Sequence, residues 1–463
     1  MPLLLGVAFA ILAALGGGAW LLIDQVGRTP AEVIDYTKRR LEGHTRLERV
    51  ALPVLDQLGT WLGMPDALEQ RLPFAVPLLP PNPALVPEPM LRAADTAAPQ
   101  AVGPTVLRVG PTRAITRIAQ AAGLARDGDT VEIDPGDYVA DVAVWDLARL
   151  TIRGTGPGVR LIAAGASAEG KAIWVIRRGR VVIENIDFIG ARVDDSNGAG
   201  IRFESGQLTV RNCLFFDNQT GILTGGGPDT RLDIEHSEFA YNGAGDGQSH
   251  HIYVGNMKAL RVVGSYFHHA NVGHLIKSRA EFNTIEYNRL SDETGGRASY
   301  ELEFPDGGVA VVVGNIIQQG TQTQNSVLLS FGAEGYKWSL NELHLAHNTL
   351  VNDHPGGGTF VRVSPGAGRI VTRNNLYAGP GRWLNVQAPV DSNGDRAVEW
   401  SYFSQPSRED YRLRPQAHQA LAATALPAEA IALRPRFEYA HARQIKPLTG
   451  PTVVPGALQS ASR

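Results

Sequence analysis

The sequence predicts an all-β fold, a solenoid of stacked parallel β-coils, and three observations lead to this class. Short strands in which apolar and polar residues alternate recur from Val181 onward. Their spacing is mostly 23 to 28 residues, with one interval of 33, and Gly and Asn turns separate them. A unit this short cannot bury its own apolar face, so neighbouring copies must stack.

The repeated unit reads as an alternating strand, an Asn or similar polar residue, and a second short strand. The copies are VVIENIDF, LTVRNCLF, LDIEHSEF, LRVVGSYF, NTIEYNRL, VVVGNIIQ, LHLAHNTL and IVTRNNLY. Alternation with period two excludes helical repeats. Four Asn residues share one place in the unit, where stacked side chains form a hydrogen-bonded ladder with a structural role: Asn288, Asn315, Asn348 and Asn375.

The chain divides into five segments. Residues 1–24 contain an uncharged stretch from Pro2 to Ile23, and about 20 apolar residues suffice to cross a bilayer, so we expect a transmembrane anchor or a signal segment. Residues 25–72 predict juxtamembrane helices, and residues 73–104 form a Pro-rich linker. The parallel solenoid is expected over 105–385, beginning with a capping helix, and residues 386–463 are expected to be a tail that packs on it.

Charge and cysteine content narrow the function classes. The formal net charge is only -3, which gives no argument for binding to nucleic acid. Cys213 is the single cysteine, so the chain can form no intramolecular disulfide.

Two regions carry a family resemblance. The stretches GDTVEIDPGDY and LTIRGTG, with the helix before them, resemble the N-terminal capping region of pectate-lyase-like right-handed parallel β-helix proteins, and the later copies resemble their repeat. The similarity covers about residues 105 to 445. It implies a β-helix that handles a polysaccharide and lies in the periplasm on an inner-membrane anchor, or is secreted. The basic residues after the first segment point the other way, because the positive-inside rule would keep them in the cytoplasm: Arg28, Lys38, Arg39 and Arg40.

Residues needed only once should interrupt the repeat, and the interruption lies between His250 and Asp306. The second strands there read HHIYVGN, GHLIKSRA and SYELEFPDGG. Alternation predicts that one set of side chains faces outward together, on coils about 4.8 Å apart: His251, Tyr253, Lys277, Glu301 and Glu303.

Five of the 12 His residues also fall in this part of the chain: His250, His251, His268, His269 and His274. Substrate binding is the main interpretation for His250, His269 and His274, together with Arg297. A divalent cation held by imidazoles and a carboxylate is an alternative, although no strict ligand spacing is present, and solvated or structural His is another. No cofactor is certain from the sequence.

The stretch LIKSRAEFNTIEYNRL also resembles the lyases of the chondroitinase B and alginate lyase family, in which Lys-Ser precedes a similar repeat. This resemblance implies β-elimination on an acidic, uronic-acid-containing polysaccharide, with Lys277 as the base. Arg279, Arg297 or a His would neutralise the substrate carboxylate, and Tyr253 or His251 would return a proton. The sequence departs from this family at two places. The position of the family's Arg, one coil further on, falls near Glu303, and the acidic calcium ligands expected just before the Lys are replaced by Ala270, Asn271 and Val272.

Four alternatives remain open at this point. Glu301 and Glu303 could serve as the carboxylate pair of a glycoside hydrolase. An epimerase would share most of the groups of the lyase. A non-catalytic β-helix could bind or guide a polysaccharide during export. Lys277 could also form only a surface ion pair with a neighbouring carboxylate.

Overall fold

The computed structural model describes residues 34, 54–55 and 104–461. The predicted anchor, and nearly all of the predicted juxtamembrane helices and Pro-rich linker, lie outside these residues. Within the described part of the chain, no helix is long and apolar enough to span a bilayer.

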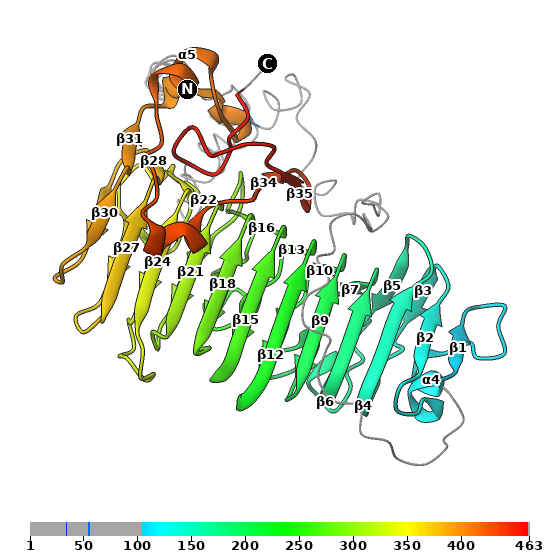
Figure 1. Ribbon diagram of the computed structural model, residues 1–463. Helices are drawn as coiled ribbons and strands as arrows, with labels where there is room; N and C mark the ends of the chain where they lie inside the picture. The colour runs from blue at the N-terminus through cyan, green and yellow to red at the C-terminus, as the bar shows by residue number, and fades with distance from the viewer. Residues whose placement is uncertain (1–33, 35–53, 56–103, 462–463) are drawn as a thin grey trace, which may run out of the picture.

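The chain winds into one elongated stack of parallel coils (Figure 1). Each regular coil contributes one strand to each of three ladders, and every pairing within these ladders is parallel. The first ladder consists of β4 (Ala143–Gly154), β6 (Ala172–Glu184), β8 (Ala199–Phe203), β11 (Thr220–Thr224), β14 (Ile252–Val254), β17 (Gly273–Ser278), β20 (Ala298–Phe304), β23 (Val327–Phe331), β26 (Thr359–Val363) and β29 (Arg382–Asn385).

The second ladder shares the long strands β4 and β6 with the first. Its other members are β1 (Val106–Val109), β2 (Thr130–Ile133), β9 (Gln207–Arg211), β12 (Gly227–Glu235), β15 (Met257–Val263), β18 (Phe282–Glu286), β21 (Val309–Val313), β24 (Glu342–Ala346), β27 (Arg369–Arg373) and β30 (Asp391–Asn393).

The third ladder is a separate 11-stranded sheet. It consists of β3 (Gly136–Val139), β5 (Val159–Ile162), β7 (Asp187–Ile189), β10 (Leu214–Phe216), β13 (Glu238–Ala240), β16 (Tyr266–His268), β19 (Arg289–Ser291), β22 (Ile316–Gln319), β25 (Thr349–Asn352), β28 (Leu376–Ala378) and β31 (Arg396–Val398).

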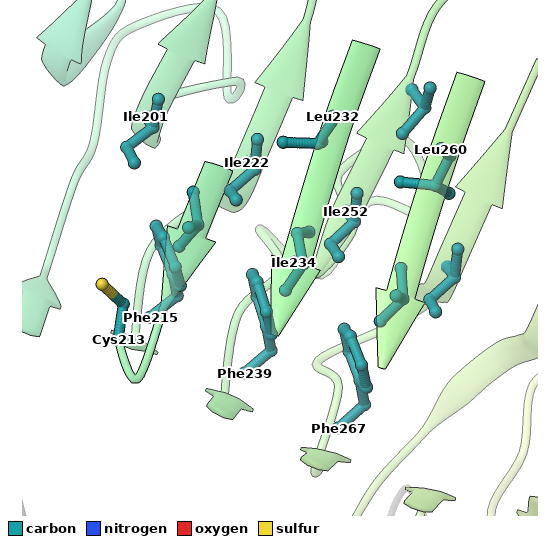
Figure 2. Close-up of a cluster of buried hydrophobic side chains, with 14 of the residues drawn as sticks. Ile201, Cys213, Phe215, Ile222, Leu232, Ile234, Phe239, Ile252, Leu260 and Phe267 are labelled. Atoms are coloured by element: carbon teal, nitrogen blue, oxygen red, sulfur yellow. The ribbon is translucent and has the colours of Figure 1, made fainter. Parts of the chain in front are cut away.

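Like residues stack on like residues inside the coils (Figure 2). The rings of Phe215, Phe239 and Phe267 lie nearly parallel, with centroids 4.6 and 4.7 Å apart. Each ends one copy of the repeat, so the repeat spacing places the rings one coil apart. Because coil spacing and ring spacing agree, the period that identifies the repeat also builds the core.

The predicted Asn ladder is confirmed. The backbone N of Asn288 donates to Oδ1 of Asn315 at 2.9 Å, and the same bond links Asn315 to Asn348 and Asn348 to Asn375 at 3.0 Å. Asn side chains therefore supply hydrogen-bond partners for the buried backbone N–H groups at the corner between the second and third ladders.

The helix α4 (Ile118–Leu124) lies against β1 and β4 at the first coils. The chain after the last coil folds back along the stack (Figure 1), where Ile445 packs with Val263 and Val313. The elements of this segment are η3 (Trp400–Tyr402), β32 (Phe403–Gln405), η4 (Pro406–Arg408), β33 (Asp410–Leu413), α5 (Pro415–Ala420), η5 (Ala428–Leu433), β34 (Phe437–Ala440) and β35 (Gln444–Pro447).

Candidate functional site

Three of the side chains selected from the sequence lie in one row on the first ladder. Tyr253 is the Cα partner of Lys277, and Lys277 is the Cα partner of Glu303. Each stands between two buried residues of its strand, so the row faces outward, as strand alternation requires.

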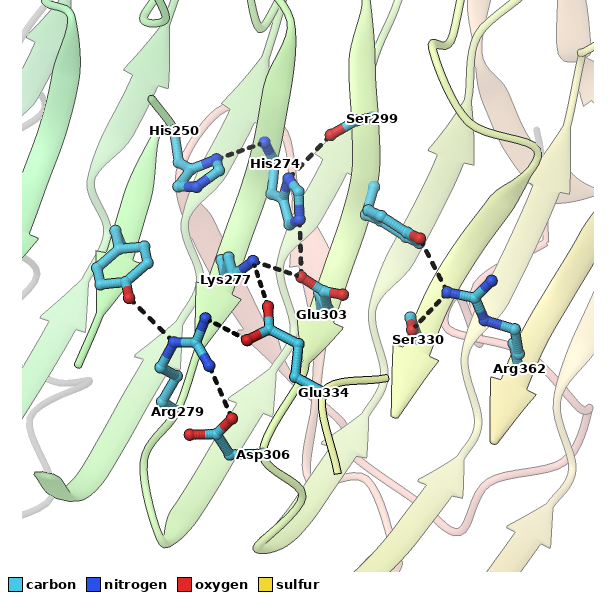
Figure 3. A network of polar contacts seen from close by, with 12 residues as sticks. His250, His274, Lys277, Arg279, Ser299, Glu303, Asp306, Ser330, Glu334 and Arg362 are labelled. Atoms are coloured by element: carbon cyan, nitrogen blue, oxygen red, sulfur yellow. Dashed lines mark hydrogen bonds and ion pairs between the residues drawn. The ribbon is translucent and has the colours of Figure 1, made fainter. Parts of the chain in front are cut away.

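Lys277 lies between two carboxylates (Figure 3). Its Nζ is 3.2 Å from Oε2 of Glu303 and 3.1 Å from Oε1 of Glu334. The Lys277 side chain is only 13% exposed, whereas that of Glu334 is 42% exposed. Glu303 is therefore an enclosed partner of Lys277, and Glu334 is the partner that faces solvent.

Arg279 connects the row to two further carboxylates (Figure 3). Its Nε donates to the Tyr253 phenol oxygen at 2.9 Å, one terminal nitrogen is 2.7 Å from Glu334 Oε2, and the other is 2.7 Å from Asp306 Oδ1. One carboxylate, that of Glu334, thus bridges Lys277 and Arg279. Burial raises the pKa of Glu334, but its hydrogen bonds to these two cations bring the net pKa below its ordinary value.

His274 approaches Glu303 from the other side of the row. Its Nε2 is 2.7 Å from Glu303 Oε2, and its Nδ1 is 2.9 Å from the Ser299 hydroxyl. Burial lowers the pKa of His274 despite this carboxylate. Burial raises the pKa of Glu303, but His274 and Lys277 outweigh it and lower the net pKa. Glu303 is therefore an ionised acceptor held by two donors.

His250 lies on the coil before His274. Its Nδ1 is 3.0 Å from the backbone N of His274, which can only donate, so this ring nitrogen is unprotonated. Burial lowers the pKa of His250 well below its ordinary value, and the charges of His274 and Lys277 act in the same direction. The ring also stacks on that of Tyr253, with centroids 5.7 Å apart. His250 thus supports the orientation of Tyr253 and His274.

Glu334 was not selected from the sequence. It lies on residues 332–341, an insertion between β23 and β24 that accounts for the single repeat interval of 33 residues. The Glu334 backbone N donates to Pro305 O at 3.0 Å, and the Trp338 ring nitrogen donates to Arg279 O at 3.2 Å. The long interval was the available signal, because an insertion at one coil can supply groups that the repeat does not. We call Tyr253, His274, Lys277, Arg279, Glu303, Asp306 and Glu334 the Lys277 cluster.

Comparison with family models agrees with this architecture. A family model described as a right-handed β-helix region matches residues 166–343. The solenoid is a right-handed parallel β-helix. Among solved structures, a pectate lyase, Pel9A, is similar over 71% of this chain and 93% of its own, with 13% identity and a TM-score of 0.49. The search of curated proteins gave no match.

The structure corrects the predicted orientation of His251 and Glu301. Both are fully buried in the β-helix. His251 Nδ1 is 2.9 Å from the Asn242 amide, and its Nε2 is 3.0 Å from His268 O. Both Glu301 carboxylate oxygens are buried without a hydrogen-bond partner among the described residues. Neither side chain can meet a polymer on the outer face.

The reason is a departure from strict alternation. Several first-ladder strands place two successive residues inside the β-helix, such as Leu275 with Ile276 and Leu328 with Leu329. Glu301 occupies the same place before Leu302, which aligns with Ile276 and Leu329. The outward pair of carboxylates proposed for a glycoside hydrolase is therefore absent.

His269 and Arg297 bond to groups outside the Lys277 cluster. His269 directly follows β16 of the third ladder. Its Nε2 is 3.0 Å from Thr294 O, and the residue lines a cavity of about 900 Å³ between that ladder and the C-terminal segment. The Arg297 guanidinium bonds to Asn271. Within residues 104–461, no three His, Cys, Asp or Glu side chains are grouped as a metal site, so no residues are assigned to the divalent cation considered above.

Proposed function

We propose that this β-helix is a carbohydrate-active enzyme, a polysaccharide lyase that cleaves an acidic, uronic-acid-containing polymer by β-elimination at the Lys277 cluster. The observation that carries the proposal is the carboxylate of Glu334, held between Lys277 Nζ at 3.1 Å and Arg279 at 2.7 Å. Two cations that converge on one carboxylate can equally hold the carboxylate of a uronate.

The substrate carboxylate replaces that of Glu334 in this proposal. Arg279 then pairs with the substrate and stabilises the negative charge that develops on its carboxylate as the C5 proton leaves. Lys277 Nζ, which contacts the same carboxylate of Glu334, then lies beside the substrate and serves as the base. Glu334 is suited to this exchange because it is the most exposed of the three carboxylates that pair with Lys277 and Arg279.

The elimination step uses Lys277 and Tyr253. Lys277, as the neutral amine, takes the C5 proton, and the electron pair of the C5–H bond forms the C4=C5 double bond. The C4–O bond breaks, and the Tyr253 phenol gives its proton to the departing oxygen. Arg279, whose Nε lies 2.9 Å from that phenol oxygen, stabilises the phenolate that remains. A proton returned from Lys277 to Tyr253 through solvent completes the cycle.

Glu303 and His274 position Lys277 in this mechanism. Glu303 Oε2 contacts both Lys277 Nζ and His274 Nε2, at 3.2 and 2.7 Å. The His274 bond leaves Glu303 ionised and fixed, so the lysine side chain keeps one orientation when Glu334 departs. We expect the enzyme to act outside the cytoplasm, in the periplasm on an inner-membrane anchor or as a secreted protein, where such polymers are accessible.

The test is the ultraviolet absorbance of unsaturated uronate products from a panel of uronic-acid polymers. The parent should generate the signal, whereas Lys277→Ala and Tyr253→Phe should lose it. Lys258→Ala is the matched control, because Lys258 lies on β15 in the second ladder and pairs with Glu281. Reducing ends without absorbance would show hydrolysis, and binding without products would show a polysaccharide-binding protein. Either result would overturn the lyase proposal.

A further inference from the structure

Two adjacent histidines on the third ladder each direct one ring nitrogen at the other. His268 ends β16 and His269 directly follows it. The Nδ1 atoms of the two rings are only 2.6 Å apart. Strand pairing aligns His268 with Ala240 and Ser291 on the neighbouring coils, so the repeat does not require a histidine at this place.

The other nitrogen of each ring determines where the ring proton lies. Nε2 of His269 is 3.0 Å from Thr294 O, a carbonyl that only accepts, so this nitrogen is protonated. Nε2 of His268 is 3.2 Å from Oε1 of Glu238. Burial raises the pKa of Glu238, but its hydrogen bond to His268 and nearby positive charges bring the net pKa below its ordinary value. The carboxylate is therefore an ionised acceptor, and Nε2 of His268 is also protonated.

Two neutral rings in these tautomers present facing lone pairs at Nδ1. Lone pairs this close repel each other, so the arrangement requires a positive charge between the rings. A proton supplies this charge if one ring is an imidazolium, and a metal ion supplies it by binding both nitrogens. The surroundings match those of metal-binding histidines, which donate the other ring N–H to a carboxylate or a backbone carbonyl. His268 and His269 use one acceptor of each kind.

Tyrosine rings hold both imidazoles in these orientations. Tyr266 stacks on His268 with ring centroids 4.2 Å apart, and Tyr241 stacks on His269 with centroids 4.7 Å apart. Zinc bound by two imidazoles at about 2.0–2.1 Å needs their nitrogens ~3.3 Å apart, and a small rotation of the rings supplies the difference. His269 also lines the cavity beside the C-terminal segment, which gives an ion a path from solvent.

We propose that Nδ1 of His268 and Nδ1 of His269 together bind one divalent transition-metal ion, such as zinc, copper or nickel, which imidazole suits. Within residues 104–461 no three His, Cys, Asp or Glu side chains are grouped as ligands, so water completes the coordination and the ion exchanges with solution. Glu238 orients a ring and does not bind the ion. The site lies on the third ladder and Lys277 on the first, so the proposal does not depend on the lyase function.

The test is calorimetry of the full-length protein with Zn²⁺. The parent should bind one equivalent that requires both rings. His268→Gln and His269→Gln should each weaken this binding by at least about tenfold, since even the outer partners of a metal-bound histidine are worth this much. His354→Gln is the matched control, because the His354 ring bonds Gly357 O in the loop after β25. Melting temperatures of the variants check that each is folded.

Electron paramagnetic resonance of the Cu²⁺-loaded protein gives a readout that does not depend on affinity. The spectrum should show coupling to two imidazole nitrogens in the parent and to one in His269→Gln. His269 is half-buried, so this variant and its spectrum decide the question if His268→Gln fails to fold.

Two results would overturn the proposal. Zinc that does not bind the parent, or that binds all three variants equally, would leave a shared proton as the only cation between the rings. A signal from two nitrogens that persists in His269→Gln would place the ion elsewhere.

Discussion

Glu334 lies 57 residues after Lys277 in the chain, yet its Oε1 is 3.1 Å from Lys277 Nζ. The contact depends on the insertion after β23, which carries Glu334 back toward the row of Tyr253, Lys277 and Glu303. Glu334 is the solvent-exposed member of the pair, with 42% of its side chain exposed, so a substrate carboxylate can replace it. The pair therefore both keeps Lys277 in place and reserves a carboxylate position for a ligand.

Glu334→Gln should strengthen the binding of acidic polymers. The substitution keeps the size of the side chain and removes the charge that competes with the substrate carboxylate. We expect affinity to rise by about fivefold, equivalent to ~1 kcal/mol, in calorimetry with a uronate polymer at low salt.

Glu342→Gln is the control for this change, since Glu342 lies on β24 and pairs with His344. It removes the same charge from the chain without touching Lys277 or Arg279. Equal gains in the two variants would mean that only net charge changed, and the assigned role of Glu334 would then be wrong.

Glu301→Leu should stabilise the fold. The carboxyl group is fully buried without a partner among the described residues, in a column where neighbouring coils place Leu275 and Leu328. Removing an unsatisfied buried polar group gains about 1–3 kcal/mol. The free energy of unfolding in urea should increase accordingly, and a decrease would contradict this assignment.

The pH dependence of the free energy of unfolding should also change in Glu301→Leu. Burial, and then the charge of Asp292, raise the pKa of Glu301 well above its ordinary value of 4.5. A raised folded-state pKa gives a contribution that is complete below the unfolded value and is lost as the pH rises toward the folded one. The parent should therefore lose this contribution above pH 4.5, and Glu301→Leu should not.

The fold could be predicted from the sequence because one repeat determines every coil. Aligning the copies of this repeat predicts the positions of the stacked Phe rings and the Asn ladder, and no contact between distant parts of the chain has to be known. The same alternation placed Tyr253, Lys277 and Glu303 in one outward row. These features are local, and the solenoid repeats them at each coil.

The missed features are those where the coil departs from its own repeat. His251 and Glu301 directly precede the inward residues Ile252 and Leu302, at a place where two successive residues lie inside the β-helix, so strict alternation predicted the opposite orientation. Glu334 arrives from an insertion whose path the repeat does not determine.

Asn315→Ala should destabilise the β-helix. Asn315 Oδ1 accepts from the backbone N of Asn288, and its amide donates to Ile285 O at 2.7 Å. Loss of both leaves buried backbone groups unsatisfied, with an expected cost of about 2–4 kcal/mol in urea unfolding. Asn197→Ala, at an exposed position, should change stability by less than about 0.5 kcal/mol. Similar effects from both would contradict the ladder's role.

His251→Gln should reduce the loss of stability in acid. Burial lowers the pKa of His251 to about 3. Only the unfolded chain then gains a proton as the pH falls below the ordinary value of 6.5, so this group destabilises the fold between these two values. The effect is about 2 kcal/mol on going from about pH 7 to pH 5. The melting temperature of the variant should fall less over this range, and a steeper fall would contradict the assignment.

The most direct test of the account is the mass of the products formed from a uronate polymer by the full-length protein. Elimination at the Lys277 cluster predicts oligomers lighter by one water than hydrolysis products, absent with Lys277→Ala and present with Lys258→Ala. Products of hydrolysis mass, or elimination products that persist in Lys277→Ala, would contradict the assignment of this face as a lyase site.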